Sequence, residues 1–250
     1  MRIRLACVAA GLVLAGSAPA MAQQQTGYVM ATYYRCAQGD AAKADAIFKQ
    51  HVTPFLKSEQ AAGHIIAYGW GEHIEGGEWR RFLYVAGSDL GALADSRAAM
   101  VAMTQSADHA QAFEEFGRLC GSHNDYIWRS KAGSQTAESL VRNRAPYAMS
   151  TYYVCKSTEA EADALVTTAF AAELNKRVKD GTIASWSWME HLFGGQFRRL
   201  LVVDGKDEKS LLANWATLMD DLEKASPDLL RRFSDICDSH ADYIWKVNTN

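Results

Sequence analysis

The sequence lacks the motifs of several large enzyme classes. It contains no Gly-x-Gly-x-x-Gly, no Walker loop, no His-Glu-x-x-His and no Gly-x-Ser-x-Gly, so nucleotide-dependent, zinc-protease and serine-hydrolase functions have no support. It also contains no Cys-x-x-Cys-His, which excludes covalent haem attachment. With 26 Lys and Arg against 29 Asp and Glu, and no basic stripe, the chain is a poor candidate for nucleic-acid binding.

Hydrophobic runs long enough to cross a membrane are absent as well. At the N-terminus, Arg2 and Arg4 precede the apolar run Leu5–Ala15, and Ala20-Met21-Ala22 forms a small-x-small site. This run is well short of the ~20 residues that a membrane span needs. We therefore expect residues 1–22 to be a cleaved secretory signal, which implies a periplasmic or secreted protein with no stable membrane anchor. The alternative is an uncleaved interfacial anchor.

An internal duplication organises the rest of the 250 residues, whose composition is 48% hydrophobic and ordinary for a globular protein. Three collinear segments match: Tyr28–Cys36 with Tyr147–Cys155 at six of nine positions, Gly63–Val85 with Gly181–Val203 at 11 of 23, and Cys120–Trp128 with Cys237–Trp245 at seven of nine. A period this long indicates duplicated domains, not a solenoid. We expect repeat 1 over 23–129, a linker over 130–146 and repeat 2 over 147–250.

Each repeat is predicted to contain four strands and two helices. The strands predicted in repeat 1 are Tyr28–Cys36, Ile65–Ile74, Trp79–Ala86 and Asp125–Trp128. The first helix runs from Asp40 towards Gly63 with a kink or a split at Pro54, and the second begins near Asp89. The resulting order, β-α-β-β-α-β, is the ferredoxin-like arrangement, so the expected fold class is α+β.

Two such units in tandem resemble the dimeric α/β-barrel superfamily. The resemblance covers Tyr28 to Trp245 and rests on element order and duplication. In that superfamily two sheets pack face to face with helices outside, so this chain would be a single-chain pseudo-dimer in which repeat 1 packs on repeat 2. The resemblance implies three kinds of function: binding of a small molecule, cofactor-free chemistry of the monooxygenase or isomerase kind, or haem binding between sheet and helices.

The cysteines predict disulfide bonds. Setting aside Cys7, the chain has four, namely Cys36, Cys120, Cys155 and Cys237. An even number in a secreted chain indicates disulfides, and four cysteines allow three pairings. Equivalence of the two repeats favours Cys36–Cys120 with Cys155–Cys237. A metal site has weaker support because no Cys-x-x-Cys occurs, and we expect neither a metal nor a cofactor.

Both repeats keep a carboxylate and two histidines. They are Glu72, His73 and His123 in repeat 1, and Glu190, His191 and His240 in repeat 2. The expected topology brings each set to the rim that carries the disulfide. A histidine beside a carboxylate suits general acid–base catalysis near neutral pH, and the same set can hold a divalent metal. Alternatively these side chains cap turns, because the Ser and Asp of Ser-His-x-Asp commonly bond backbone groups.

Strand alternation predicts an aromatic lining for a ligand site. We expect the barrel interior to be lined by large rings from both repeats: Tyr33, Tyr68, Trp70, Tyr152, Trp186 and Trp188. Arg81 and Arg199 are candidates for an anion contact or for an ion pair with Glu72 or Glu190 across the hairpin. An apolar, aromatic lining is typical of small-molecule sites, although such rings can also simply fill the interface. The expected function is therefore that of an exported protein that binds a small apolar or aromatic molecule.

Overall fold

The structure is a computed structural model that describes residues 27–37, 39–136, 140–141, 145–156 and 159–248. The predicted signal segment, residues 1–22, lies outside these residues. The strands are β1 (Tyr28–Arg35), β2 (Ala67–Gly76), β3 (Arg81–Gly87), β4 (Ser122–Gly133), β5 (Tyr147–Val154), β6 (Ser185–Gly194), β7 (Arg199–Gly205) and β8 (Ser239–Asn248). They form a closed antiparallel barrel in the order β1-β3-β2-β8-β5-β7-β6-β4, with β4 paired back to β1.

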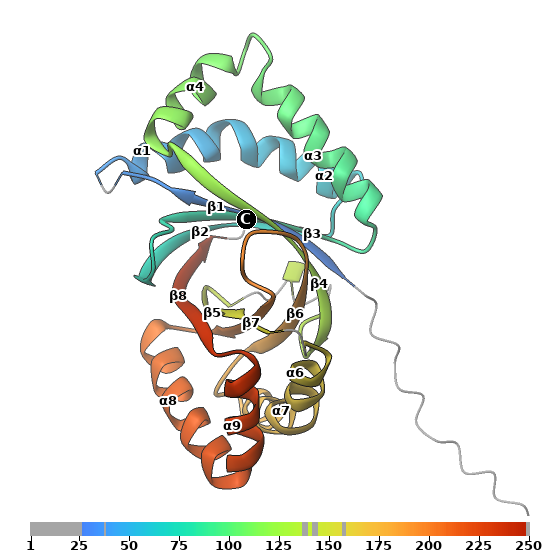
Figure 1. The fold of residues 1–250 in the computed structure, drawn as a ribbon. Helices are drawn as coiled ribbons and strands as arrows, with labels where there is room; N and C mark the ends of the chain where they lie inside the picture. Colours follow the sequence, from blue (N-terminus) through green and yellow to red (C-terminus); the bar gives the residue numbers. More distant parts are fainter. Residues whose placement is uncertain (1–26, 38, 137–139, 142–144, 157–158, 249–250) are drawn as a thin grey trace, which may run out of the picture.

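Helices cover the barrel on two opposite sides (Figure 1). Those of the first half are α1 (Ala41–Ile47), the π-helical turn η1 (Phe48–Val52), α2 (Thr53–Ala61), α3 (Leu90–Thr104) and α4 (Ala110–Leu119). Those of the second half are α6 (Glu159–Leu165), the π-helical turn η2 (Val166–Phe170), α7 (Ala171–Lys179), α8 (Glu208–Ala225) and α9 (Pro227–Ile236). None of the helices in the described residues has the length and apolar character needed to cross a membrane.

Each half of the chain supplies four neighbouring strands, and the halves join at two seams. β4-β1-β3-β2 come from the first half and β8-β5-β7-β6 from the second. The seams are the antiparallel pairs β2–β8 and β4–β6, and both contain register shifts. β4 continues to Gly133, past the predicted end at Trp128, because its additional residues pair with β6. The predicted strand was too short because its partner lies in the other half.

The first helix of each half is interrupted by a π-helical turn. We predicted a kink or a split at Pro54, but that residue lies in the first turn of α2, where proline is tolerated. The second half has the same turn, η2, and no proline there, so proline is not its cause. The helices end before Gly63 and Gly181, whose φ angles of 78° and 71° suit glycine after a helix.

Helices α3 and α8 begin after aspartates that cap them, and Asp89 is where the start of α3 was expected. The Asp89 carboxylate accepts a hydrogen bond from the Ala92 amide, and Asp207 accepts one from the Ser210 amide, both at 2.7 Å. Such caps satisfy amides that have no partner within the helix. The caps also fix the alignment of α3 with α8, because equivalent residues lie 118 positions apart.

Aromatic rings fill the barrel interior, but they are not all the predicted ones. Tyr33 and Tyr152 face inward as expected, together with eight further rings: Trp79, Phe82, Tyr84, Tyr126, Trp128, Phe197, Tyr243 and Trp245. The prediction for Tyr68, Trp70, Trp186 and Trp188 was wrong, because all four face the helices.

The small residues of β2 explain the wrong assignment. Because side chains alternate along a strand, placing Tyr68 and Trp70 inside the barrel implied that Gly69 and Gly71 face the helices, but these glycines face inward beneath rings of β3. A Cβ atom at Gly69 would lie 2.2 Å from the Tyr84 ring, and one at Gly71 would lie 1.7 Å from the Phe82 ring. On the opposite face, Trp70 stacks on Phe48 of η1 with ring centroids 4.2 Å apart. Glycine therefore makes room for rings inside the barrel, not for helices outside it.

Two disulfides tie the first strand of each half to the residue that follows its last helix. The bonds are Cys36–Cys120 and Cys155–Cys237, which confirms the predicted pairing. Their sequence separations are 84 and 82 residues, so each contributes about 4 kcal/mol in the loop-entropy model. Disulfides of this kind fit an oxidising compartment.

Candidate functional site

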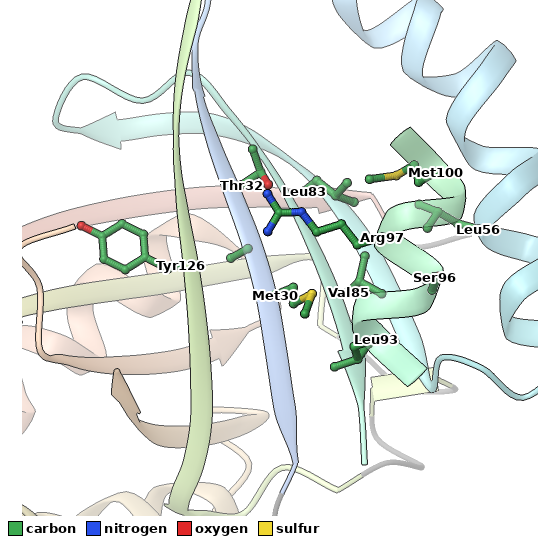
Figure 2. A pocket seen from close by; sticks show the side chains of 11 residues that line it. Met30, Thr32, Leu56, Leu83, Val85, Leu93, Ser96, Arg97, Met100 and Tyr126 are labelled. Carbon is green, nitrogen blue, oxygen red and sulfur yellow. The ribbon is translucent and has the colours of Figure 1, made fainter. Parts of the chain in front are cut away.

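A pocket lies between the outer face of the first-half sheet and helix α3. It encloses about 420 Å³ of space not filled by protein atoms. Its walls are mainly aliphatic and come from β1, α2, β3 and α3: Met30, Leu56, Leu83, Val85, Leu93 and Met100 (Figure 2). Ser96 and Arg97 of α3 and Thr32 of β1 supply its polar groups. An apolar cleft with a few polar groups at one edge is typical of small-molecule sites.

A carboxylate joins the polar groups at this edge. The Thr32 hydroxyl donates to Asp125 Oδ1 at 2.6 Å, and Arg97 Nη2 donates to Asp125 Oδ2 at 2.9 Å. His123 Nε2 lies 3.5 Å from the same Oδ2. Arg97 extends from α3 towards Thr32 across the edge of the pocket (Figure 2). The Asp125 carboxylate therefore contacts both a cation, Arg97, and an imidazole, His123.

Tyr34 of β1 lies beside this cluster. Burial raises the pKa of its phenol, and the nearby Asp125 carboxylate raises that pKa further, while a hydrogen bond with Thr32 opposes the shift. The Tyr34 ring lies 5.8 Å from the His123 ring. The phenol therefore remains protonated at neutral pH and serves as a neutral hydrogen-bonding group.

The equivalent position in the second half holds a smaller pocket. The space under α8 is about 220 Å³ and is lined by Met149, Leu174, Val203 and Leu211, the counterparts of Met30, Leu56, Val85 and Leu93. Asn214, Trp215 and Leu218 stand where the first half has Ser96, Arg97 and Met100. The second half keeps the His240–Asp242 contact at 3.2 Å, but a bulky indole takes the place of the arginine. The two halves therefore offer different sites despite their shared fold.

The predicted rim residues do not gather into one group. His73 packs on the inner rings, 5.9 Å from Trp245 and 6.1 Å from Tyr243, whereas His123 lies beside Tyr34 on the helix side. Burial lowers the pKa of His73, and the neighbouring Arg80 lowers it further. Burial and Arg198 lower the pKa of His191 in the same way. These two imidazoles are held neutral among rings, away from the pocket.

The two predicted carboxylates form ion pairs. Glu72 Oε1 lies 3.9 Å from Arg81 Nη2, so the expected cross-hairpin pair occurs in the first half. Glu190 instead pairs with Arg129 and, at 3.4 Å, with Lys131 of β4. Glu190 therefore helps to join the two halves.

The two arginine candidates are buried between sheet and helices. Arg81 donates two hydrogen bonds to Asp45, at 2.6 and 2.8 Å, and Arg199 donates two to Asp163, at 2.7 and 2.9 Å. Each aspartate also accepts the indole N–H of Trp70 or Trp188. Both guanidinium groups are therefore already paired with a carboxylate.

The sequence analysis missed Thr32, Arg97 and Asp125 as site residues. Asp125 was noted only as part of the Ser-His-x-Asp turn. When the two helices are aligned on Asp89 and Asp207, Arg97 and Trp215 occupy equivalent positions. That contrast between otherwise equivalent positions is the feature of the sequence from which the site can be found.

The pocket residues do not fit a haem. Haem iron is held by His, Cys or Tyr, or by Met together with His. No His or Cys lines either of these pockets, and the Tyr126 ring lies inside the barrel, away from α3 (Figure 2). Across the described part of the chain, no cluster of three or more His, Cys, Asp or Glu is suited to a metal ion.

Comparison with known proteins shows a likeness of fold and none of sequence. No protein-family model matches the chain, and no curated protein matches it in sequence. Among solved structures, an anthrone oxidase-like protein matches with a TM-score of 0.58 at 10% identity, over 91% of this chain and 94% of that one. A mutant chlorite dismutase from Candidatus Nitrospira defluvii matches with a TM-score of 0.52 at 10% identity, over 90% and 92%. The chain thus shares its fold with these proteins.

Proposed function

We propose that this protein is exported and binds a small, mainly apolar molecule in the pocket under α3. The observation that carries the proposal is the difference between the halves: one keeps an open pocket with a polar edge, and the other is narrowed by larger side chains. Export is supported by the N-terminal segment and by the two disulfides. The ligand class is aromatic or alicyclic, with one polar group directed at Thr32, Arg97 and Asp125.

We further infer that the chain is a single-chain pseudo-dimer of two ferredoxin-like repeats, over 23–129 and 147–250. Its support is the strand order, in which β4-β1-β3-β2 of the first half corresponds to β8-β5-β7-β6 of the second. Fusion of two copies frees one pocket from the constraint of being identical to the other. In such a pseudo-dimer, the first half binds the ligand and the second half stabilises the barrel.

The test replaces the three pocket residues by their second-half counterparts. The variant Ser96→Asn, Arg97→Trp and Met100→Leu uses side chains that the same fold already accommodates under α8. Anthrone, a flat apolar ketone suggested by the similar anthrone oxidase-like protein, serves as the probe, with calorimetry under nitrogen. We expect the wild type to bind and the triple variant to lose binding at unchanged melting temperature. The control Trp215→Phe alters only the second half, and binding that survives in the triple variant would overturn the proposal.

A second candidate function is cofactor-free acid–base chemistry on the bound molecule. It is favoured by Asp125, which contacts both Arg97 and His123 at the pocket edge, since a carboxylate-oriented imidazole can remove a proton from a substrate. Under air, the rate of anthraquinone formation from anthrone measures such chemistry. We expect His123→Ala to lower that rate and His240→Ala to leave it unchanged. Equal rates in both variants would exclude His123 as the base.

A further inference from the structure

A second cavity lies inside the barrel, on the inner face of the sheet. It encloses about 490 Å³ of space not filled by atoms, part of it continuous with solvent. Residues of both halves line it, mostly small or aliphatic: Val29, Ala31, Ala86, Leu140, Ala148, Met189, Leu200 and Val202. None of the described residues that line it carries a charge. A neutral, apolar occupant is therefore the one that the walls accommodate.

The same cavity is lined by donors that are short of acceptors. Trp128 is fully buried, and its indole N–H has no acceptor in hydrogen-bonding geometry within the described residues, although it lies near the Tyr33 hydroxyl. Tyr33, Tyr152 and Ser150 line the same cavity. Burial raises the pKa of both phenols, so they stay protonated.

The unpaired indole is the donor that this cavity offers. An indole can donate a hydrogen bond but never accept one, so the Trp128 N–H can be satisfied only by an acceptor. A buried donor of this kind favours an occupant that brings an acceptor oxygen.

Gln135, two residues after the end of β4, is attached to the strands at one side of this cavity. Gln135 lines the cavity, its side-chain amide donates to Asp204 Oδ2 at 2.8 Å, and its carbonyl accepts from the Ser187 hydroxyl at 3.0 Å. The first half has Ala86 and Gly69 where the second has Asp204 and Ser187. The polar attachment thus exists on one side only, which gives the cavity a defined wall beside the strands.

We propose that the barrel interior is a second binding site, distinct from the pocket under α3, for a small neutral ring compound that carries a carbonyl or ether oxygen. The aliphatic walls accept the ring. The Trp128 indole N–H donates to the oxygen. A charged molecule is excluded, because none of the described side chains at the walls carries a charge to offset the loss of its water.

The experiment compares two probes of the same shape. Acetophenone and α-methylstyrene differ only in a carbonyl oxygen in place of a methylene group, and calorimetry on the full mature chain measures both. We expect acetophenone to bind about fivefold more tightly, as one buried hydrogen bond allows. Trp128→Phe keeps the ring and removes the donor, so it should reduce that preference. Trp245→Phe is the matched control at the equivalent position, which does not line the cavity, and should keep it.

Two further variants separate this site from the other pocket. All of these measurements are made in the triple variant of Ser96, Arg97 and Met100, in which the pocket under α3 is filled, so the two proposals can fail independently. In that background, Ala148→Leu places a larger side chain at a wall of the inner cavity and should abolish binding of both probes. Binding that survives in Ala148→Leu, or a preference that survives in Trp128→Phe, would overturn the inference. If Ala148→Leu does not fold, Trp128→Phe against Trp245→Phe decides.

Discussion

One aspartate in each half makes the same contacts. Asp45 and Asp163 each accept hydrogen bonds from an arginine of the neighbouring hairpin and from the indole of the preceding strand. The two arginines are buried and the aspartates are only partly exposed, so each pair matches a charge whose burial alone would be costly. At the residue scale, Arg81 and Arg199 therefore attach helices to sheet and do not capture an anion.

The pair in the second half makes a pH-dependent contribution to stability. Burial alone would raise the pKa of Asp163, but its hydrogen bonds from Arg199 and Trp188 outweigh burial and hold the pKa below its ordinary value. A depressed native pKa means that the stabilisation is complete above the unfolded value of about 3.9 and is lost as the pH falls through the native value.

We expect Asp163→Asn to lower the free energy of unfolding by about 3 kcal/mol at pH 7. The difference from wild type should shrink as the pH falls below about 4, since the wild-type carboxylate is then lost as well. Urea unfolding at pH 7, 5 and 3.5 measures this. Asp228→Asn is the control, because its partner Arg231 and Asp228 itself are both largely exposed and such pairs contribute little. Equal losses for the two variants would contradict the assignment.

At the scale of elements, the two hairpins between paired strands join the halves. The β2–β3 hairpin packs on β8, and the β6–β7 hairpin packs on β4. Gly76 and Gly194 have φ angles of 111° and 124°, a region that glycine adopts without strain. A Cβ atom at Gly76 would lie 2.0 Å from the Asp242 carbonyl oxygen, and one at Gly194 would lie 2.3 Å from that of Asp125. Each glycine therefore allows the backbone of one half to approach the other.

We expect Gly76→Ala and Gly194→Ala each to cost more than about 2 kcal/mol, from backbone strain and from overlap with the opposite strand. Gly117→Ala is the matched control in α4, where an added Cβ meets nothing within 4 Å. It should leave stability unchanged or raise it by about 0.5–1 kcal/mol, since alanine favours helix. Thermal unfolding of the three variants compares them, and similar melting temperatures would show that the hairpins are not close contacts.

At the scale of the whole molecule, neither half can form the barrel alone. Without the second half, β2 loses β8 and β4 loses β6, and an inner face that includes Trp79 and Trp128 is exposed. Each such ring has about 150–250 Å² of surface to bury. Because the two seams are equivalent, a second copy of the first half offers the missing partners.

A fragment of residues 23–133 is therefore expected to form a homodimer or to aggregate, with β2 of one copy beside β4 of the other. Sedimentation equilibrium under oxidising conditions gives its mass, and amide exchange at β2 and β4 shows whether the new seams form. The full chain measured in parallel is the control. A stable, monomeric fragment would contradict the role assigned to the seams.

Local patterns in the sequence were enough to predict the duplication, the order of strands and helices, the starts of α3 and α8, and the disulfide pairing. Each of these features depends either on residues a few positions apart in the sequence or on the equivalence of the two copies. Alternation along a strand also separated its two faces correctly, as the shared inward side of Tyr33 and Tyr152 shows. It did not decide which face of β2 points inward, because rings and glycines suit either side until their partners are known.

Only the tertiary structure decided that question. Trp70 packs against Phe48 and donates to Asp45, residues that precede it by more than twenty positions, and Gly69 lies beneath Tyr84 of the next strand. The pocket edge depends in the same way on distant residues, since Asp125 meets Arg97 and Thr32 only when β4, α3 and β1 pack together. Side-chain direction and site geometry are set by packing across the sheet, which no local pattern records.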